Sequence, residues 1–411
     1  MAFAKLLAAA TAAVAVAAAS ASTVTAAHAG NYIGYLSGHQ MVPPVNAAGT
    51  GTITGAYDSN SMMLSIKFHF RGLAAGVKSV GLYAAWAGRN GHEQFSVTYA
   101  TKFGAGHRSG NGEARMKLSA RQVKLLEARE FYLLVGSELR AQLVPAVAGA
   151  KTMSASLSSA FTNPPTTSTA FGGIIVELMP TGAMVVTGSW QGLSSPLALN
   201  LANGNHFHVG LTGTNGQRIF ELQPTLSDNN TTAFYTADKN TYMPTPEFLK
   251  MMKNRGVYMD VHSAKLPTGE LRGQVLSAAS SSAYTTLLTP GAVNPPVSGS
   301  DATGGLSVEY FYPNTMAVTG SFSQLSGEVA VDLAMGTHLH RGPADGAGPR
   351  FQELVADKSE ANTAGDFMLS KNTFRLNSTL VEALRMGMAY SDIHSQAFRG
   401  GELRGQLASV V

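Results

Sequence analysis

The feature that most constrains the fold of this chain is an internal repeat. The segment Glu138-Leu139-Arg140-Ala141-Gln142 recurs as Glu270-Leu271-Arg272-Gly273-Gln274 and again as Glu402-Leu403-Arg404-Gly405-Gln406. Successive copies of the glutamate lie 132 residues apart. Self-similarity at a fixed, long period indicates one structural unit copied along the chain. The 411 residues are therefore expected to form three units, each long enough to bury its own core.

The three units also begin alike. Each opens with a segment that ends in two prolines, Pro43-Pro44, Pro164-Pro165 and Pro295-Pro296, and an alternating strand follows. Small residues of the kind that link domains separate each closing segment from the next opening. These stretches set boundaries near residues 150 and 280. We expect units at residues 30–150, 151–280 and 281–411.

The composition favours short strands over long helices. The chain has 44 Gly, 17 Pro and only 13% charged residues, and apolar and polar residues alternate over short runs. One short helix is expected before each closing segment, because the capping residues Ser119, Thr245 and Asn377 each precede an apolar run. This is too little helix for parallel crossovers. The predicted fold is all-β, with three tandem antiparallel β-sandwiches that each carry one short helix.

Residues 1–29 are typical of a secretory signal peptide. They hold one charged residue, Lys5, then an Ala- and Val-rich apolar run, and the small residues Ala27 and Ala29 precede Gly30. A membrane anchor is the alternative, but the run is only weakly apolar. No later stretch approaches the ~20 apolar residues that a span needs. We expect a secreted, extracellular protein that has no transmembrane segment once the signal is removed.

Several classes of function are disfavoured by what the sequence lacks. The chain has no cysteine, which excludes disulfides, thiolate metal ligands and thiol catalysis. Its net charge of +4 arises without a basic run interleaved with aromatics, so no nucleic-acid partner is expected. No nucleophile elbow, phosphate loop or glycosidase-like pair of acids stands out. We therefore assign no catalytic residue and lean towards a protein that is not an enzyme.

The second and third units carry matching sets of histidines and one aspartate. The sets are His206, His208, Asp260 and His262 in the second unit, and His338, His340, Asp392 and His394 in the third. In both sets, 56 residues separate the first histidine from the last. Side chains two residues apart on a strand point to the same side of a sheet. Each unit is therefore expected to gather three imidazoles and one carboxylate on one side.

These sets predict a metal site in each of the two units, with copper or zinc as the expected ion. Three histidines and one aspartate would complete a tetrahedral zinc site, and the same donors suit Cu²⁺. Alternatively, the aspartate orients one imidazole and leaves a coordination position open. A structural alternative is that the histidines hydrogen-bond backbone carbonyls and shape the glycine-rich loops that follow.

The first unit lacks the whole set. Gly81 and Tyr83 fall where the other units have His-x-His, and Leu134 and Gly136 fall where they have Asp-x-His. The double proline and the closing Glu-x-Arg pair persist in all three units. The set therefore behaves as a group that the module can lose, whereas the closing pair belongs to its frame.

Other conspicuous residues are expected to serve the frame. We interpret Glu270 and Arg272, with their third-unit counterparts Glu402 and Arg404, as an exposed and mainly structural pair on the last strand. His69 lies between two phenylalanines and is expected at a half-buried edge of the core. The two tryptophans, Trp86 and Trp190, offer slight support for carbohydrate or cell-wall adhesion.

These marks together resemble the chordin (CHRD) domain. The resemblance depends on the double proline, on the His-x-His followed by a glycine-rich turn, and on the closing stretches 258–274 and 390–406. It is good in the second and third units and degenerate in the first. The resemblance implies extracellular β-sandwiches of the immunoglobulin-like kind, similar to the copper/zinc superoxide dismutase sandwich. The chain lacks that enzyme's cysteine pair and has too few histidines per unit for two metals, so dismutase activity is not expected.

The sequence therefore predicts a secreted or cell-surface protein whose tandem modules bind partners. The expected partner is an extracellular protein or a matrix or cell-wall component, and self-association is a further possibility that tandem weak sites would favour. The alternative from another class is a mononuclear copper or zinc enzyme of superoxide-dismutase-like fold, with the two histidine sets as its centres.

Overall fold

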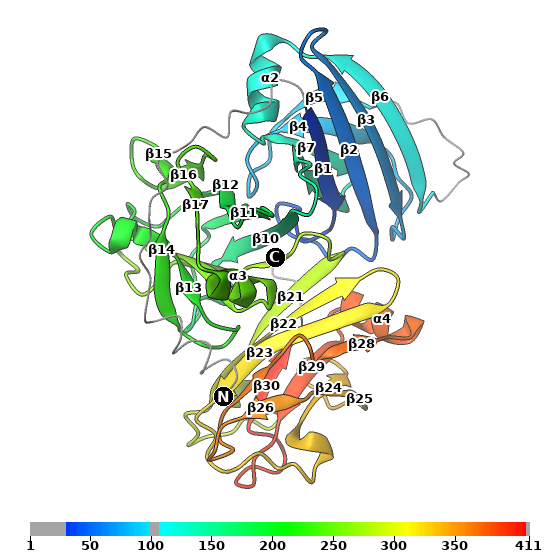
Figure 1. Ribbon diagram of the computed structural model, residues 1–411. Helices are drawn as coiled ribbons and strands as arrows, with labels where there is room; N and C mark the ends of the chain where they lie inside the picture. Colours follow the sequence, from blue (N-terminus) through cyan, green and yellow to red (C-terminus); the bar gives the residue numbers. More distant parts are fainter. Residues whose placement is uncertain (1–29, 98–106, 408–411) are drawn as a thin grey trace.

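The computed structural model in Figure 1 describes residues 30–97 and 107–407, and it shows three β-rich lobes. We call them module 1, module 2 and module 3; their strands span residues 30–145, 151–277 and 282–406. The predicted signal peptide, residues 1–29, lies outside the described residues. All strand pairs within the described part are antiparallel, which confirms the predicted all-β fold. Among these residues, no helix is long and apolar enough to cross a membrane.

Module 1 consists of two sheets, in the orders β6-β3-β2-β1-β9 and β5-β4-β7-β8. Its strands are β1 (Gly30–Leu36), β2 (Thr50–Asp58), β3 (Met63–Arg71), β4 (Val80–Ala84), β5 (His92–Ser96), β6 (Gly110–Lys117), β7 (Phe131–Val135), β8 (Leu139–Gln142) and β9 (Val144–Pro145). A single bridge between Ser37 and Arg140 joins the sheets at one edge.

Module 2 repeats this plan. Its strands are β10 (Lys151–Ser158), β11 (Phe171–Leu178), β12 (Met184–Gln191), β13 (Asn205–Val209), β14 (Gln217–Glu221), β15 (Thr225–Leu226), β16 (Thr232–Tyr235), β17 (Thr241–Tyr242), β18 (Val257–Val261), β19 (Leu271–Gln274) and β20 (Leu276–Ser277). Strands β10, β11, β12, β16 and β15 form one half, and β19, β18, β13 and β14 form the other. The bridge between the halves pairs Ser158 with Arg272.

Module 3 has the same two sheets, β21-β22-β23-β27-β26 and β25-β24-β29-β30. Its strands are β21 (Ser282–Leu288), β22 (Thr303–Phe311), β23 (Thr315–Ser323), β24 (Thr337–Arg341), β25 (Arg350–Glu353), β26 (Ala356–Lys358), β27 (Gly365–Phe367), β28 (Thr373–Arg375), β29 (Ala389–Ile393) and β30 (Leu403–Gln406). Its bridge joins Thr289 to Arg404. The closing arginine thus sits at the seam of every module.

Each module has one short α-helix before its last two long strands, as the capping residues predict. The helices are α2 (Ala120–Glu127), α3 (Pro246–Lys253) and α4 (Ser378–Arg385). The side chains of Ser119, Thr245 and Asn377 accept the capping hydrogen bonds from backbone N–H groups. These caps satisfy donors that a helix leaves unpaired in its first turn, which explains why each helix begins where it does.

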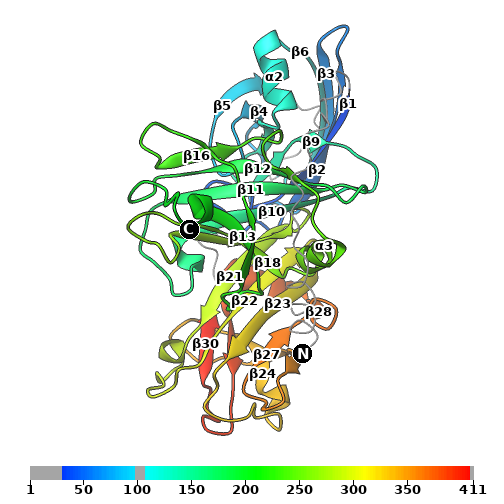
Figure 2. The same cartoon turned by 60° about the vertical axis from the view of Figure 1, so that its left-hand side comes forward.

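Each module encloses its own apolar core between its two sheets. Ile53, Ile174 and Leu306 occupy the same place on the second strand of modules 1, 2 and 3, and each is buried. In module 1, the outward positions of that strand are exposed, so β2 alternates between buried and exposed residues. In β11 and β22, nearly every residue is buried. The difference arises because a neighbouring module covers the outer face in modules 2 and 3 but not in module 1 (Figure 2).

Candidate metal centre

Strand alternation places the histidines of module 2 on the side of the sheet that faces away from the core. Phe207 and Met259, which alternate with them, belong to the apolar core. Strands β13 and β18 pair so that His206 lies opposite Asp260. His262 follows the last residue of β18. The structure brings His206, His208 and His262 together, with one potential ligand atom of each within 4.8 Å of the others.

The three imidazole rings are held by backbone carbonyls through Nδ1. His206 Nδ1 lies 3.2 Å from the Ala202 carbonyl, His208 Nδ1 lies 2.8 Å from that of Gly216, and His262 Nδ1 lies 2.9 Å from that of Pro267. A carbonyl oxygen only accepts, so each Nδ1 carries the proton. The lone pair of each neutral ring is therefore on Nε2. This is the arrangement that orients histidine ligands in metal proteins.

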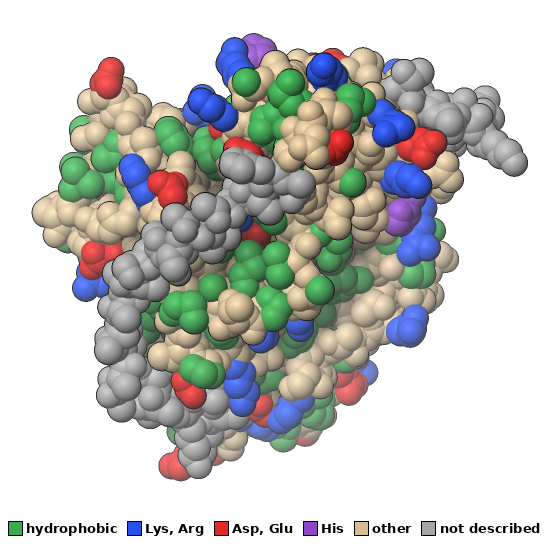
Figure 3. Space-filling view, turned by 45° about the horizontal axis from the view of Figure 1, so that its top comes forward, with side chains coloured by type: hydrophobic (Ala, Val, Ile, Leu, Met, Phe, Trp, Pro, Cys, Tyr) green, Lys and Arg blue, Asp and Glu red, His purple; other side chains and the backbone are tan. Residues whose placement is uncertain are grey.

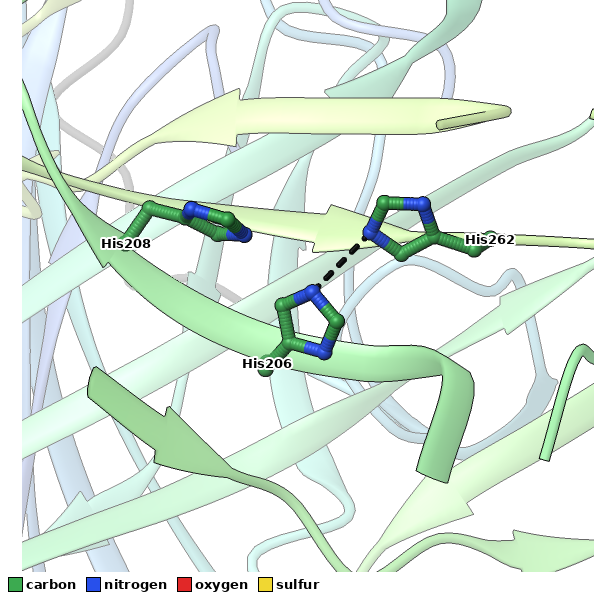
Figure 4. Close-up of side chains that lie close together, drawn as sticks. All are labelled: His206, His208 and His262. Carbon is green, nitrogen blue, oxygen red and sulfur yellow. Dashed lines mark hydrogen bonds between the residues drawn. The ribbon is translucent and has the colours of Figure 1, made fainter. Parts of the chain in front are cut away.

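The Nε2 atoms of His206 and His262 face one another at 3.0 Å (Figure 4). With both Nδ1 atoms protonated, two lone pairs meet, and only a cation or an added proton between them makes the contact favourable. Burial lowers the pKa of His206 to about 4 and also lowers that of His262. Protonation is therefore disfavoured at neutral pH, and the three histidines could hold a metal ion.

Asp260 lies beside the histidines in a site of low exposure. Its Oδ2 atom is 3.9 Å from His208 Nε2. His208 Nε2 and Asp260 Oδ1 are both buried without a hydrogen-bond partner among the described residues. Burial raises the pKa of the Asp260 carboxyl to about 7, although Arg272 opposes the shift. Burial also lowers the pKa of His208 to about 4. Buried polar atoms are normally paired, so these two identify a place where a polar group would bind.

Module 3 repeats the arrangement. His338 Nε2 and His394 Nε2 are 3.0 Å apart, and His340 Nε2 is 3.9 Å from Asp392 Oδ2. The Nδ1 atoms of these histidines face the carbonyls of Ala334, Gly348 and Arg399 at 3.3, 2.7 and 2.9 Å. His340 Nε2 and Asp392 Oδ1 are again buried without a hydrogen-bond partner among the described residues. Burial lowers the pKa of His338 to about 4 and raises that of Asp392.

A stack of three side chains supports the centre from one side. The ring of His208 stacks on Tyr258 at 4.9 Å between centroids, and the guanidinium of Arg272 lies 3.4 Å from the centre of the same tyrosine ring. Module 3 has the same stack of His340, Tyr390 and Arg404. The recurring Tyr-x-Asp-x-His was visible in the sequence, but its tyrosine was not expected to position a histidine.

Module 1 keeps the stack without the imidazole. Tyr83 stacks on Tyr132 at 5.6 Å, and Arg140 lies 3.6 Å from the centre of the Tyr132 ring. Gly91 N–H donates to the Tyr132 hydroxyl, as Gly216 N–H donates to that of Tyr258, which confirms the alignment of the units. A tyrosine can therefore fill the stack. The imidazole of His208 adds an Nε2 lone pair, which the stack does not use.

The closing Glu-x-Arg pair is buried, so its predicted exposure was wrong. Glu270 is fully buried and Arg272 is 4% exposed. Glu270 accepts hydrogen bonds from Ser168 Oγ and Ser194 N, and Arg272 donates to Asn215 Oδ1 and the Thr214 carbonyl. The loops that cover the strand provide these partners, and strand alternation cannot reveal them. Both side chains hold the module together, as expected of the frame.

Three other expectations about single residues also change. His69 is exposed rather than half-buried in the core, because the outer face of its sheet is uncovered. Trp190 is fully buried and donates to the Tyr235 hydroxyl. Trp86 is 9% exposed and stacks on Phe234 of module 2 at 5.5 Å. Neither tryptophan offers a free ring on which a sugar could stack.

The comparison with family models agrees with the repeat. The model of the CHRD domain matches residues 34–143, 153–275 and 284–407, which together make up most of the chain. A search of curated proteins found no significant match. The matched segments coincide with the three lobes, and the first of them is the one that lacks the histidine set. The chain therefore belongs to the CHRD domain family and carries three of its modules in tandem.

Proposed function

We propose that this protein is a secreted or cell-surface binding protein whose second and third CHRD modules each hold one copper or zinc ion. The observation that carries the metal proposal is the set of three carbonyl-anchored imidazoles whose Nε2 atoms converge in module 2. Three neutral nitrogen donors and a neighbouring carboxylate suit Zn²⁺ and Cu²⁺ better than Ca²⁺ or Mg²⁺, which take mainly oxygen ligands.

In this proposal His206, His208 and His262 bind the ion through Nε2. Asp260 either completes the coordination or accepts a hydrogen bond from a bound water, and its position beside His208 allows both. Tyr258 and Arg272 position His208 through the stack. His338, His340, Asp392 and His394 have the same roles in module 3. A bound ion would supply Lewis acidity, or redox chemistry if it were copper.

Export is supported by residues 1–29, which are typical of a signal peptide, and by membership of a family that is typically extracellular. The partner that we propose is an extracellular protein or a component of a matrix or cell wall. Modules in tandem strengthen weak binding because the second contact forms at a high effective concentration.

A direct test is the metal content of the purified full-length protein after loading with Zn²⁺ or Cu²⁺ and removal of excess ion. We expect one ion per histidine set, hence two per chain. The triple substitution His206→Ala, His208→Ala and His262→Ala should remove one of them. The matched control is His69→Ala, which removes an exposed histidine and should leave both. A native protein that retains neither ion refutes the metal proposal.

A mononuclear metal enzyme is the second candidate, and one observation favours it. One carboxylate oxygen of Asp260 is buried, has no hydrogen-bond partner among the described residues, and lies next to three nitrogen donors, where an acid could exchange a proton with a metal-bound water. The electron paramagnetic resonance spectrum of the copper-loaded protein tests this idea. A spectrum that changes on addition of azide indicates an exchangeable coordination position. A spectrum that azide leaves unchanged removes the enzyme candidate and leaves the binding function in place.

A further inference from the structure

The same surface joins module 1 to module 2 and module 2 to module 3. In the first junction, the turn after β4 packs against β11 of the next module, and Ser189 Oγ donates to the Ala87 carbonyl at 2.8 Å. In the second, the turn after β13 packs against β22, and Ser321 Oγ donates to the Thr212 carbonyl at 2.9 Å. We call the turn side of a module its front face and the outer side of its β2, β11 or β22 sheet its back face.

Each junction contains one buried ion pair between the two modules. Arg129, just after α2, donates to Glu177 at 2.5 Å, and Arg255, just after α3, donates to Glu309 at 2.6 Å. The side chains in these pairs are between 2% and 12% exposed. Breaking such a pair on one side leaves an uncompensated buried charge, which is strongly unfavourable.

Glycines let the two backbones approach. Gly88 has φ +83° and Gly213 has φ +95°, conformations that side chains rarely adopt. A Cβ atom added at Gly88 would overlap the backbone of Gly173, and one added at Gly213 would overlap that of Gly305. The junction therefore depends on a glycine and an arginine on the front face, and on a glutamate and small side chains on the back face.

The front face of module 3 has lost both of its elements. Counting from the glycine that hydrogen-bonds the stacked tyrosine (Gly216 in module 2, Gly348 in module 3) places Asp345 where module 2 has Gly213. The position of Arg255 is taken by Gly387, which keeps the same backbone angle, φ +64°. Asp345 is exposed. The β-carbon and carboxylate of Asp345 therefore occupy the position where the two backbones would have to approach most closely. Gly387 provides no positive charge to pair with the glutamate of a docking module.

The back face of module 1 has lost its elements as well. Strand registers align Ala56 with Glu177 and Glu309, Lys67 with Thr187 and Thr319, and His69 with Ser189 and Ser321. Ala56 and Lys67 line an open hollow of about 760 Å³ over this sheet. Figure 3 shows Lys and Arg side chains gathered along the right-hand side of the view, on the part of the molecule that holds β3 and β6. Arg115 and Glu113 line the same hollow, and Glu113 Oε2 lies 3.9 Å from Lys67 Nζ. A front-face arginine would therefore meet two cations and an acid that is already paired, with alanine in place of the docking glutamate.

Modules 1 and 3 also contact each other directly, for example through the hydrogen bond from Asn46 Nδ2 to the Arg385 carbonyl. We infer that the CHRD modules of this chain dock through one directional, head-to-tail surface, and that the two faces left undocked, the back face of module 1 and the front face of module 3, are closed to it, so that a second copy cannot extend the array. A head-to-tail surface that does not close on itself would otherwise generate an open filament. Terminal units of repeat arrays differ from the internal ones in the same manner. The inference is independent of metal binding and restricts self-association through this surface.

The test uses two full-length variants, and each of them restores the docking residues on one of the two altered faces. The front variant carries Asp345→Gly and Gly387→Arg, and the back variant carries Ala56→Glu, Lys67→Thr and His69→Ser. In sedimentation velocity, the wild-type protein and each variant alone are expected to stay single chains. An equimolar mixture of the two variants should form a species of twice the mass. One chain with all five substitutions should form filaments whose length grows with concentration.

A charge-swapped pair protects the test against a variant that fails to fold. Gly387→Glu with Asp345→Gly on one chain and Ala56→Arg with His69→Ser on another should associate with each other. The Gly387→Glu chain should not associate with the back variant that carries Ala56→Glu, and the Ala56→Arg chain should not associate with the front variant that carries Gly387→Arg, because like charges would meet. Mixtures of both designs that stay single chains up to ~1 mM, the effective concentration that a short linker gives, would overturn the inference. Wild-type oligomers that Ala56→Arg dissociates would overturn it too.

Discussion

Modules 1 and 2 have the same frame, but only module 2 has the histidines. Both have a closing arginine over a tyrosine ring, and in both the closing glutamine side chain donates to two carbonyls, those of Ala85 and Arg129 in module 1 and those of Gly210 and Arg255 in module 2. Module 1 folds around this frame with glycine, tyrosine and leucine in place of the ligand set. The comparison teaches that the histidines are not needed for the sandwich, so the convergence of their buried Nε2 atoms on the side away from the core calls for a separate explanation.

Metal removal should affect modules 2 and 3 and leave module 1 unchanged. Ligand that binds only the folded state stabilises it by about 4 kcal/mol when its free concentration is a thousand times Kd. Addition of Zn²⁺ to the apoprotein should therefore raise the unfolding free energy of modules 2 and 3, as measured by hydrogen exchange resolved along the chain. If Zn²⁺ increased the protection of β7 in module 1 as much as that of β18 and β29, the conclusion that the frame is independent of the histidine site would be contradicted.

Acid should weaken module 1 through a histidine that is not part of any metal set. His39 is buried, and its ring nitrogens lie 2.8 Å from Ser154 Oγ and 3.4 Å from Ser280 Oγ. Burial lowers the pKa of His39 from 6.5 to about 4. The unfolded chain takes up this proton below pH 6.5 and the folded chain only near pH 4, so stability falls as the pH falls between these values, by at most about 3 kcal/mol.

Chemical denaturation of the metal-free protein at pH 7 and pH 4.5 measures this effect. The stability difference between wild type and His39→Gln should shift against the wild type as the pH falls. His69→Ala serves as the control, because His69 is exposed. A difference between wild type and His39→Gln that stays constant over this range would rule out His39 as the source of acid sensitivity.

Substitution of the frame arginine should cost the same in a module with the ligand set and in one without it. Arg140→Met and Arg272→Met remove the stacked guanidinium and its hydrogen bonds to loop carbonyls, while the stem of the side chain is kept. We expect each to lower the unfolding free energy by about 2 kcal/mol. A loss confined to Arg272→Met would show that the frame depends on the metal site after all.

The smallest effect on stability is expected from His208→Tyr. Tyr83 occupies this position in module 1 and stacks on the equivalent tyrosine, so the stack survives and the unfolding free energy of the apoprotein should change by less than about 1 kcal/mol. Metal content should nonetheless fall by one ion per chain. Retention of both ions would remove His208 from the proposed ligands, whereas loss of fold would show that module 2 needs the imidazole itself.

The sequence predicted those parts of the molecule that depend on local chemistry and on period. The three units and the placement of His206, His208 and His262 on one side follow from spacing, and the helices follow from their capping residues. Burial of Arg272 could not be predicted, because the loop at Thr214 and Asn215 covers it only in the folded module. The exposure of His69 depends on the absence of a neighbour over its sheet, which strand alternation does not report.

The ion pairs between modules were missed for a related reason. Arg129 and Glu177 are 48 residues apart and belong to different units, so neither lies in a motif of its own unit. A signal was nonetheless present in the repeat. Glu177 and Glu309 share a position that is Ala56 in the first unit, and Arg129 and Arg255 share one that is Gly387 in the last. Differences between units therefore carry information about junctions that the shared motifs do not.

The carbonyl contacts of the histidines bear on whether folding or metal binding comes first. Because Nδ1 of each ring is hydrogen-bonded to the main chain, the positions of the three rings are set when the polypeptide folds, and the proposed ion would find its donors already in place. In the proposed site, little conformational entropy would be lost on metal binding, and an ion that needs six oxygen ligands would not find them among these donors. If the proposed ion binds, the folded backbone therefore restricts which ion the site accepts.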